Sequence, residues 1–270
     1  MADYKLEKLS GRTPLEVART PNMDNISSNG IMGVASTVPK NFKPGSDVAC
    51  LSVLGYNPAE YYTGRAPLES ASLGIELGEN DWAVRCNLIT ANEGILEDFS
   101  AGHVSDEEAK LIMSMLNDKF ADKNVKFYAG KSYRNIMVYS GDVTLEADCT
   151  PPHDIIGKPI TKNLPKGSGS EILFELMRDS FHLLENHEVN KVRLDLGENP
   201  ANMIWLWGQG KRPSLTPFKE LYGISGAVIT GVDLLRGLAT YIGWNIIEVP
   251  GATAYLDTDY DAKAKYAIEA

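Results

Sequence analysis

The feature that most constrains the fold is a change in hydrophobic pattern near residue 81. From there to about residue 140, strand-length apolar runs such as WAVRCNLI and SYRNIMVY flank a helical segment, SDEEAKLIMSMLNDKFAD, in which Ser105 and Glu108 predict a capping box. Before and after this region, apolar runs alternate with helices and Pro/Gly turns. The pattern predicts a discontinuous α/β domain with parallel strands, residues 1–80 and 191–270, interrupted by an inserted α+β domain, residues 81–190.

Local patterns refine the first domain. TPLEVARTPNMDNISSNG predicts one helix that stops at Gly30, and IMGVASTV, residues 31–38, is typical of a strand. Pro-Gly just ahead of Ser46, followed by an apolar run, predicts that Ser46 lies at or near a helix N-terminus. IWLWG, residues 204–208, is predicted to be a strand of the α/β domain.

Composition and charge exclude several classes of function. The 270 residues are 43% hydrophobic, which is enough for a sizeable core, and the net charge of -10 with scattered basic residues excludes a nucleic-acid footprint. An acidic protein repels an anionic substrate, so binding of one would rest on a few Arg and Lys residues focused in a cleft. The start of the chain shows no signal peptide, and charges interrupt its longest apolar stretch, so we expect a cytoplasmic protein without membrane association.

Four motifs occur along the chain: TPNMDNISSNG (residues 20–30), PGSDVACLSVLGYNPAEYYTGRAPLE (44–69), ANMIWLWGQGKRP (201–213) and VPGATAYLDTDY (249–260). Together, and in this order, they resemble the archaeal-type, 2,3-bisphosphoglycerate-independent phosphoglycerate mutases of the alkaline phosphatase superfamily. The resemblance runs over the whole chain. It implies an alkaline-phosphatase-like α/β sheet flanked by helices, with an inserted α+β domain.

The resemblance also implies a reaction. Members interconvert 3-phosphoglycerate and 2-phosphoglycerate in glycolysis and gluconeogenesis through a phosphoserine, and Ser46 matches that serine, which is also a metal ligand. They use two divalent ions (Mn²⁺, Mg²⁺ or Zn²⁺) and no 2,3-bisphosphoglycerate. Taken without the motif, a serine after Pro-Gly is more often a helix N-cap than a nucleophile.

The resemblance further implies that the chain lacks both ends of a family member. Members begin with a strand whose GDGMADY-like turn supplies a metal-binding aspartate, and Met1 matches the methionine of that turn. They continue beyond Ala270 into Asp/His motifs that supply most metal ligands. We therefore expect this chain by itself not to hold both ions and to be inactive.

Five residues are candidates for binding the substrate's phosphate and carboxylate, which require cations. The resemblance favours Lys211, after the glycine-rich turn, and His103, ahead of the predicted helix; Arg65, Arg85 and Arg134 are arginines in apolar or motif surroundings. Surface ion pairing is the alternative for each arginine and for Lys211, and an ordinary loop histidine is the alternative for His103. His153, in PPHD, is interpreted as a turn residue, and GQGK lacks the spacing of a nucleotide-binding phosphate loop.

Two other functions stay open. A phosphatase or another phosphomutase of the superfamily could use the same serine on a different phosphate ester. A non-catalytic fragment could bind phosphorylated acids without turnover. The expected partners are small phosphoglycerates, and the sequence leaves the oligomeric state open.

Overall fold

The computed structural model describes residues 4–270, which form two units, residues 4–43 and 44–270. The first unit contains a 3-10 turn, η1 (Glu7–Leu9), and two short helices, α1 (Pro14–Val17) and α2 (Pro21–Asn29). The single helix expected here is divided because Pro21 disfavours helical geometry in the residue before it and starts α2 instead. The strand expected at 31–38 is wrong: these residues pair with no strand in the described chain, and an isolated strand is not stable.

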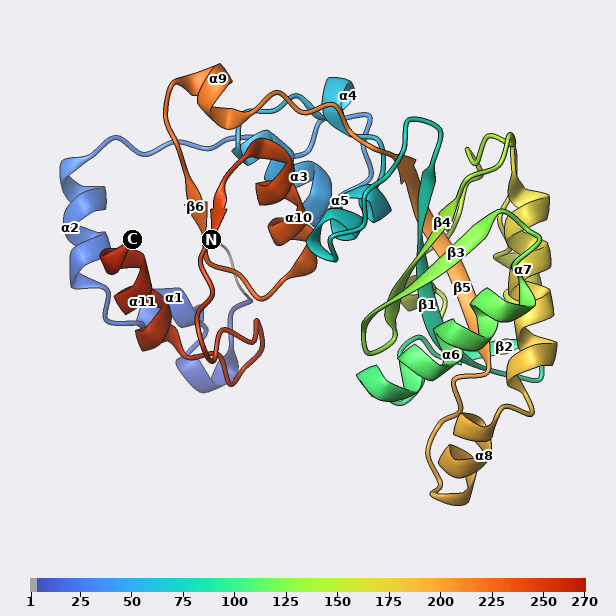
Figure 1. The fold of residues 1–270 in the computed structure, drawn as a ribbon. Coiled ribbons are helices and arrows are strands. Elements are labelled where there is room, and N and C mark those ends of the chain that lie inside the picture. Colours follow the sequence, from blue (N-terminus) through green and yellow to red (C-terminus); the bar gives the residue numbers. More distant parts are fainter. Residues whose placement is uncertain (1–3) are drawn as a thin grey trace. The chain divides into compact units, whose positions relative to one another are not determined.

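The second unit contains an antiparallel sheet built around one long strand, β1 (Trp82–Asn92), shown in Figure 1. Its neighbours are β4 (Arg134–Tyr139) on one side and β5 (Met203–Lys211) on the other. The hairpin partner β2 (Ile95–Asp98) pairs with the end of β1, and β3 (Val125–Lys131) pairs with β4.

Strand β5 joins this sheet and not a parallel one. IWLWG was expected in the parallel-stranded domain after residue 190, but β5 runs antiparallel to β1, with Cys86 opposite Leu206. The sheet therefore continues past residue 190, while the domain boundaries stay a prediction. The strand is apolar because it is buried on both faces. Periodicity alone does not show which sheet such a strand joins.

Alternation along β1 gives the sheet two different faces. Val84, Cys86 and Leu88 belong to the main core with the buried stripes of α6 (Asp106–Lys119) and α7 (Ser170–Leu184). Ala83 belongs to a smaller core with Ala66 of α5 (Arg65–Ser72). Because successive side chains alternate, Arg85 and Asn87 belong to the face toward α5, although both are buried.

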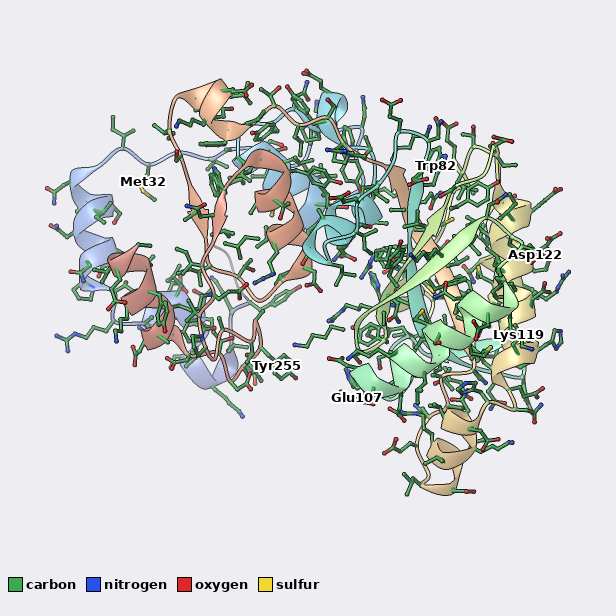
Figure 2. The ribbon with its side chains drawn as sticks, viewed as in Figure 1. Met32, Trp82, Glu107, Lys119, Asp122 and Tyr255 are labelled. Carbon is green, nitrogen blue, oxygen red and sulfur yellow. The ribbon has the colours of Figure 1, made fainter. Side chains whose placement is uncertain are left out.

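Capping and amphipathic burial explain α6. The Ser105 hydroxyl accepts from the Glu108 amide at 3.2 Å, and Glu108 accepts from the Ser105 amide at 2.8 Å, which confirms the predicted capping box. The charged Glu107 and Lys119 of the same helix, labelled in Figure 2, are exposed. After α7, the short α8 (Glu188–Asp195) leads into β5.

The remaining elements of the second unit are α3 (Ser46–Val53), α4 (Pro58–Tyr61), α9 (Phe218–Tyr222), α10 (Asp233–Ile242), α11 (Tyr260–Glu269), the parallel pair β6 (Ala227–Val228) and β7 (Asn245–Ile246), and the turns η2 (Pro152–Asp154) and η3 (Ile160–Lys162). Leu51, Leu68 and Leu238 place α3, α5 and α10 in a second core. Ile160 of η3 belongs to the main core instead. The fold is thus mixed α/β, with sheets flanked by helices.

Candidate active site

Ser46 is the first residue of α3, as the sequence predicts, and its side chain is exposed. The N-cap, Gly45, provides no side-chain hydrogen bond, so the first turn of α3 has amide donors that its cap does not occupy. An anion next to Ser46 would meet the positive end of the helix dipole and the first-turn amides other than that of Val48, which donates to Asp47. The role of Ser46 as nucleophile stays a prediction.

The next residue, Asp47, connects α3 to the segment before α5. Its buried carboxylate accepts hydrogen bonds from the Val48 amide at 3.0 Å and from the Tyr62 hydroxyl at 2.5 Å. Burial and the Asp47 charge raise the pKa of Tyr62, so its proton stays on the phenol and the hydroxyl stays a donor. The orientation of the first turn of α3 is thereby tied to the segment that precedes Arg65.

Two predicted arginines meet at one carboxylate that the sequence analysis did not select. Glu69, on α5, accepts from Arg65 Nε at 2.8 Å through one oxygen and from Arg85 Nε at 2.6 Å through the other. The side chain of Arg85 is only 6% exposed, whereas that of Arg65 is 28% exposed. Burial and the positive charge of Arg65 outweigh Glu69 and lower the pKa of Arg85 to about 10, so it remains a cation at neutral pH.

Trp207 of β5 covers the two arginines. The guanidinium carbon of Arg85 lies 4.1 Å from its ring centroid and that of Arg65 lies 5.9 Å away, both within cation–π range. The indole Nε1 donates to Asn87 Oδ1 at 3.1 Å, which fixes the ring. We refer to Arg65, Glu69, Arg85 and Trp207 as the arginine–tryptophan cluster. One carboxylate against two guanidinium groups leaves it with a net positive charge.

The backbone just before α5 lies very close to the backbone near the end of β5. A Cβ added to Gly64 would lie 2.2 Å from the Gln209 carbonyl oxygen, and one added to Gly210 would lie 2.2 Å from the Thr63 carbonyl oxygen. Side chains at these two positions would therefore separate the helix from the strand. The glycines of TGRAP and GQGK serve this packing, which agrees with the sequence argument against a phosphate loop.

Aromatic rings connect the cluster to the other predicted residues. The ring centroids of Trp207 and His153 lie 5.5 Å apart. The ring of Phe99 lies 6.2 Å from that of His153 and 5.6 Å from that of Tyr133, so the four rings form a row. Tyr133 contacts His103 at 5.9 Å and accepts a 2.8 Å hydrogen bond from Arg134. Three arginines from α5, β1 and β4 thus contact the rings of this row.

His153, which was expected to be a turn residue, is indeed in the turn η2, but its ring also faces Trp207. Burial, with the positive charges of Arg85 and Arg65, lowers the pKa of His153, although Asp154 opposes the change. The pKa of His153 therefore depends on the charge of the arginine–tryptophan cluster. The local sequences of His153 and Trp207 do not indicate their contact, since the two residues are distant along the chain. The i,i+4 spacing of Arg65 and Glu69 could have indicated their pair, but not the bond from Arg85 to Glu69.

Lys211 lies apart from these contacts. It is four residues beyond Trp207 on β5, roughly 13 Å along the strand. Its ammonium lies 5.4 Å from the ring of Trp82, which Figure 2 labels, and its carbonyl accepts from the Thr63 hydroxyl at 2.6 Å. Its substrate role stays a prediction, as do those of the other candidates.

The two-metal site implied by the resemblance has no matching donor set in residues 4–270. Nowhere in that range do three or more His, Cys, Asp or Glu side chains converge in a way that could hold an ion. Asp47, the carboxylate next to Ser46, is engaged by Tyr62 and Val48. In the same range, no helix is both long and apolar enough to cross a bilayer.

Comparison with known proteins places these features in a family. The family model described as 2,3-bisphosphoglycerate-independent phosphoglycerate mutase matches residues 27–190. The enzyme of that name from Methanosarcina mazei is 53% identical over 270 residues, covering 100% of this chain and 68% of its own length. A probable enzyme of the same name from Geobacter sulfurreducens is 46% identical, with coverage of 100% and 68%.

Solved structures agree. The cofactor-independent phosphoglycerate mutase of Thermoplasma acidophilum superposes with a TM-score of 0.58 at 27% identity, covering 100% of this chain and 71% of its own. A Pyrococcus horikoshii protein gives a TM-score of 0.75 at 28% identity, covering 100% and 64%. The chain thus spans about two thirds of the length of these relatives. It belongs to the family of 2,3-bisphosphoglycerate-independent phosphoglycerate mutases.

Proposed function

We propose that this chain binds phosphoglycerate at the arginine–tryptophan cluster and that Ser46 accepts the phosphoryl group in the interconversion of 3-phosphoglycerate and 2-phosphoglycerate. The observation that carries the proposal is the convergence of Arg65 and Arg85 on the single carboxylate of Glu69, beneath Trp207. Phosphate and carboxylate groups are recognised best by guanidinium pairs.

Arg85 and Arg65 differ in exposure, and we assign them different roles for that reason. Arg85 is buried and held by Glu69 and Trp207, so it supplies fixed positive charge without needing to reorganise. Arg65 is more exposed and donates to Glu69 through Nε, which leaves the terminal nitrogens of its guanidinium outside that bond. Arg65 is therefore the side chain of the cluster best suited to contact an incoming anion.

Ser46 and the cluster are coupled through Tyr62. Its hydroxyl binds the carboxylate of Asp47, adjacent to Ser46, and the charges of Arg65 and Glu69 also act on the phenol. A substrate on Arg65 would therefore lie within the same electrostatic surroundings as the first turn of α3. In such a site the serine would accept the phosphoryl group and return it to the other hydroxyl of a retained glycerate.

For the divalent ions that the resemblance implies, the described residues offer no converging donor set. The family name states that the reaction is independent of 2,3-bisphosphoglycerate. Cytoplasmic location remains an expectation from the sequence.

Calorimetric titration of 3-phosphoglycerate, with and without Mn²⁺, tests the binding half of the proposal. We expect Arg65→Gln to weaken binding by about tenfold or more, since a charged hydrogen bond contributes roughly 1.5–3 kcal/mol. Arg236→Gln is the matched control: Arg236 also pairs with a glutamate, Glu248, but lies on α10 outside the cluster. Equal loss in both variants, or none in Arg65→Gln, contradicts the assignment.

A further inference from the structure

The segment between β2 and α6 has an unusual backbone. Ala101, Gly102 and His103 are consecutive residues with positive φ angles of 48°, 62° and 54°. Glycine adopts this left-handed region freely, but alanine and histidine do so at a cost. Two of the three residues therefore need outside contacts to hold them there.

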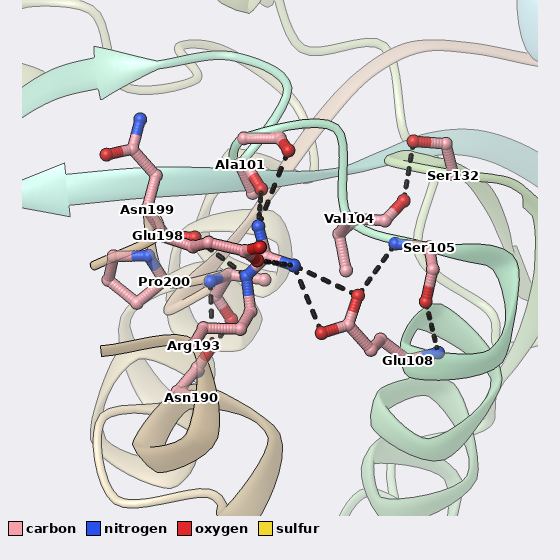
Figure 3. A network of polar contacts seen from close by, with 12 residues as sticks. Ala101, Val104, Ser105, Glu108, Ser132, Asn190, Arg193, Glu198, Asn199 and Pro200 are labelled. Carbon is pink, nitrogen blue, oxygen red and sulfur yellow. Dashed lines mark hydrogen bonds and ion pairs between the residues drawn. The ribbon is translucent and has the colours of Figure 1, made fainter. Parts of the chain in front are cut away.

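Arg193 of α8 contacts this turn at the Ala101 carbonyl, as Figure 3 shows. Its Nη2 donates to the Ala101 carbonyl at 2.8 Å, its Nε donates to the Asn199 carbonyl at 2.8 Å, and its Nη1 donates to Glu108 at 2.9 Å. The Arg193 side chain is only 3% exposed. One buried guanidinium thus joins the left-handed turn, the first turn of α6 and the loop before β5.

A second anchor holds the other side of the same turn. Asp98 accepts from the Gly102 amide at 2.6 Å and from the Ser100 amide at 2.8 Å. Asn199, whose carbonyl binds Arg193, also donates its side-chain amide to Asp98 at 3.0 Å. The Ala101 carbonyl therefore accepts from a cation and the Gly102 amide donates to an anion, and these bonds together fix the conformation of the turn.

The segment carries two residues of the row of rings that leads to the arginine–tryptophan cluster. Phe99 and His103 both contact the ring of Tyr133, whose hydroxyl accepts from Arg134. The Ser132 hydroxyl donates to the Val104 carbonyl at 2.7 Å, which attaches the β3–β4 hairpin to the same segment. The direction of the His103 side chain is thus set by backbone angles that Arg193 maintains.

We propose that Arg193 is a positioning residue: it holds Ala101–His103 in the left-handed turn that presents His103 beside Tyr133 and Arg134 for contact with an anionic substrate. The proposal deepens, and rests on, the proposed function. Arg193 itself is enclosed by protein groups, so it acts through the turn.

Two substitutions perturb the anchor differently. Arg193→Lys keeps the positive charge, but an ammonium cannot reproduce the planar fork that reaches Ala101, Asn199 and Glu108 together. Gly102→Ala keeps Arg193 but puts a Cβ 2.8 Å from its Nη2, at a φ unsuited to alanine. Asn190→Ala is the control, because Asn190 is buried on the same helix and binds the Leu184 and Ala201 carbonyls without contacting the turn.

The measurements are NMR signals of Ala101–His103 and titration with 3-phosphoglycerate. We expect Arg193→Lys and Gly102→Ala to move those signals and to weaken binding about tenfold. Asn190→Ala should lower thermal stability while leaving both the signals and the affinity close to wild type. A purely structural role for Arg193 predicts that Arg193→Lys and Asn190→Ala behave alike, which would overturn the proposal.

A double variant separates positioning from general damage. If Arg193 acts through His103, then Arg193→Lys in a His103→Ala background should weaken binding by less than twofold beyond His103→Ala alone. Full additivity overturns the positioning role. If the wild-type protein binds no 3-phosphoglycerate, both the proposed function and the substrate role of this turn are wrong. If it binds and Arg193→Lys binds equally well, only the positioning role of Arg193 is wrong.

Discussion

Replacing Glu69 with glutamine tests the electrostatic logic of the arginine–tryptophan cluster. The substitution keeps the size of the side chain and an acceptor oxygen but removes the negative charge that pairs with both Arg65 and Arg85. The buried Arg85 would then remain a cation without its counter-charge. The consequence should be a loss of stability together with stronger attraction of an external anion.

The two ion pairs contribute unequally to that loss. Arg65 is 28% exposed, so solvent screens its pair and its share is below about 1 kcal/mol. Arg85 is 6% exposed, and breaking a buried pair from one side costs about 3–5 kcal/mol. We expect Glu69→Gln to lower the free energy of unfolding by about 3 kcal/mol, which corresponds to a fall in Tm of about 6–12 °C.

Urea denaturation followed by tryptophan fluorescence measures this change. The variant Glu175→Gln is the control, since its carboxylate pairs with Lys123 at an exposed site and its loss should leave stability close to wild type. Adding Arg85→Met to Glu69→Gln should restore part of the stability by removing the stranded charge. A loss below about 1 kcal/mol in Glu69→Gln, or no recovery in the double variant, would refute the reasoning.

Two further predictions concern pH. The pKa of His153 lies below its ordinary value of 6.5, and a bound anion favours the imidazolium. Affinity for 3-phosphoglycerate should therefore rise as pH falls below 6.5. The variant His153→Asn should lose this rise and keep only the pH dependence that comes from titration of the ligand. Burial raises the pKa of Glu108, but hydrogen bonds from Ser105 and Arg193 outweigh it and lower the pKa below 4.5. Its stabilising contribution is therefore present above pH 4.5 and lost as pH falls through the folded value, so wild type and Glu108→Gln should converge in urea denaturation at acid pH, and an unchanged difference would contradict this.

Local signals predicted much of the fold correctly. Pro-Gly before an apolar run placed Ser46 at the start of α3, and the Ser105–Glu108 pair predicted the cap of α6. Both depend on contacts within one helical turn, so the sequence contains them entirely. The mixed α/β class followed from the strand and helix periods.

Contacts between distant segments could not be predicted in the same way. Strand β5 has the apolar composition of a buried strand, but only its pairing with β1 shows which sheet it joins. Glu69 was not selected as a candidate, although it lies in the same motif as Arg65. Its bond with Arg85 joins two separate elements, α5 and β1, which the sequence does not show to be in contact. His153 resembles an ordinary turn residue until the ring of Trp207 is placed beside it.

The central claim is that Ser46 receives the phosphoryl group of a phosphoglycerate bound at the arginine–tryptophan cluster. Intact-mass and peptide mass spectrometry after incubation with 3-phosphoglycerate and Mn²⁺, in parallel with an assay for 2-phosphoglycerate and free phosphate, tests it most directly. The account predicts one added phosphoryl group located on Ser46 and none on Ser46→Ala, whose fold should be unchanged because that side chain is exposed. A phosphoryl group on another residue, or 2-phosphoglycerate formed equally well by Ser46→Ala, would contradict it.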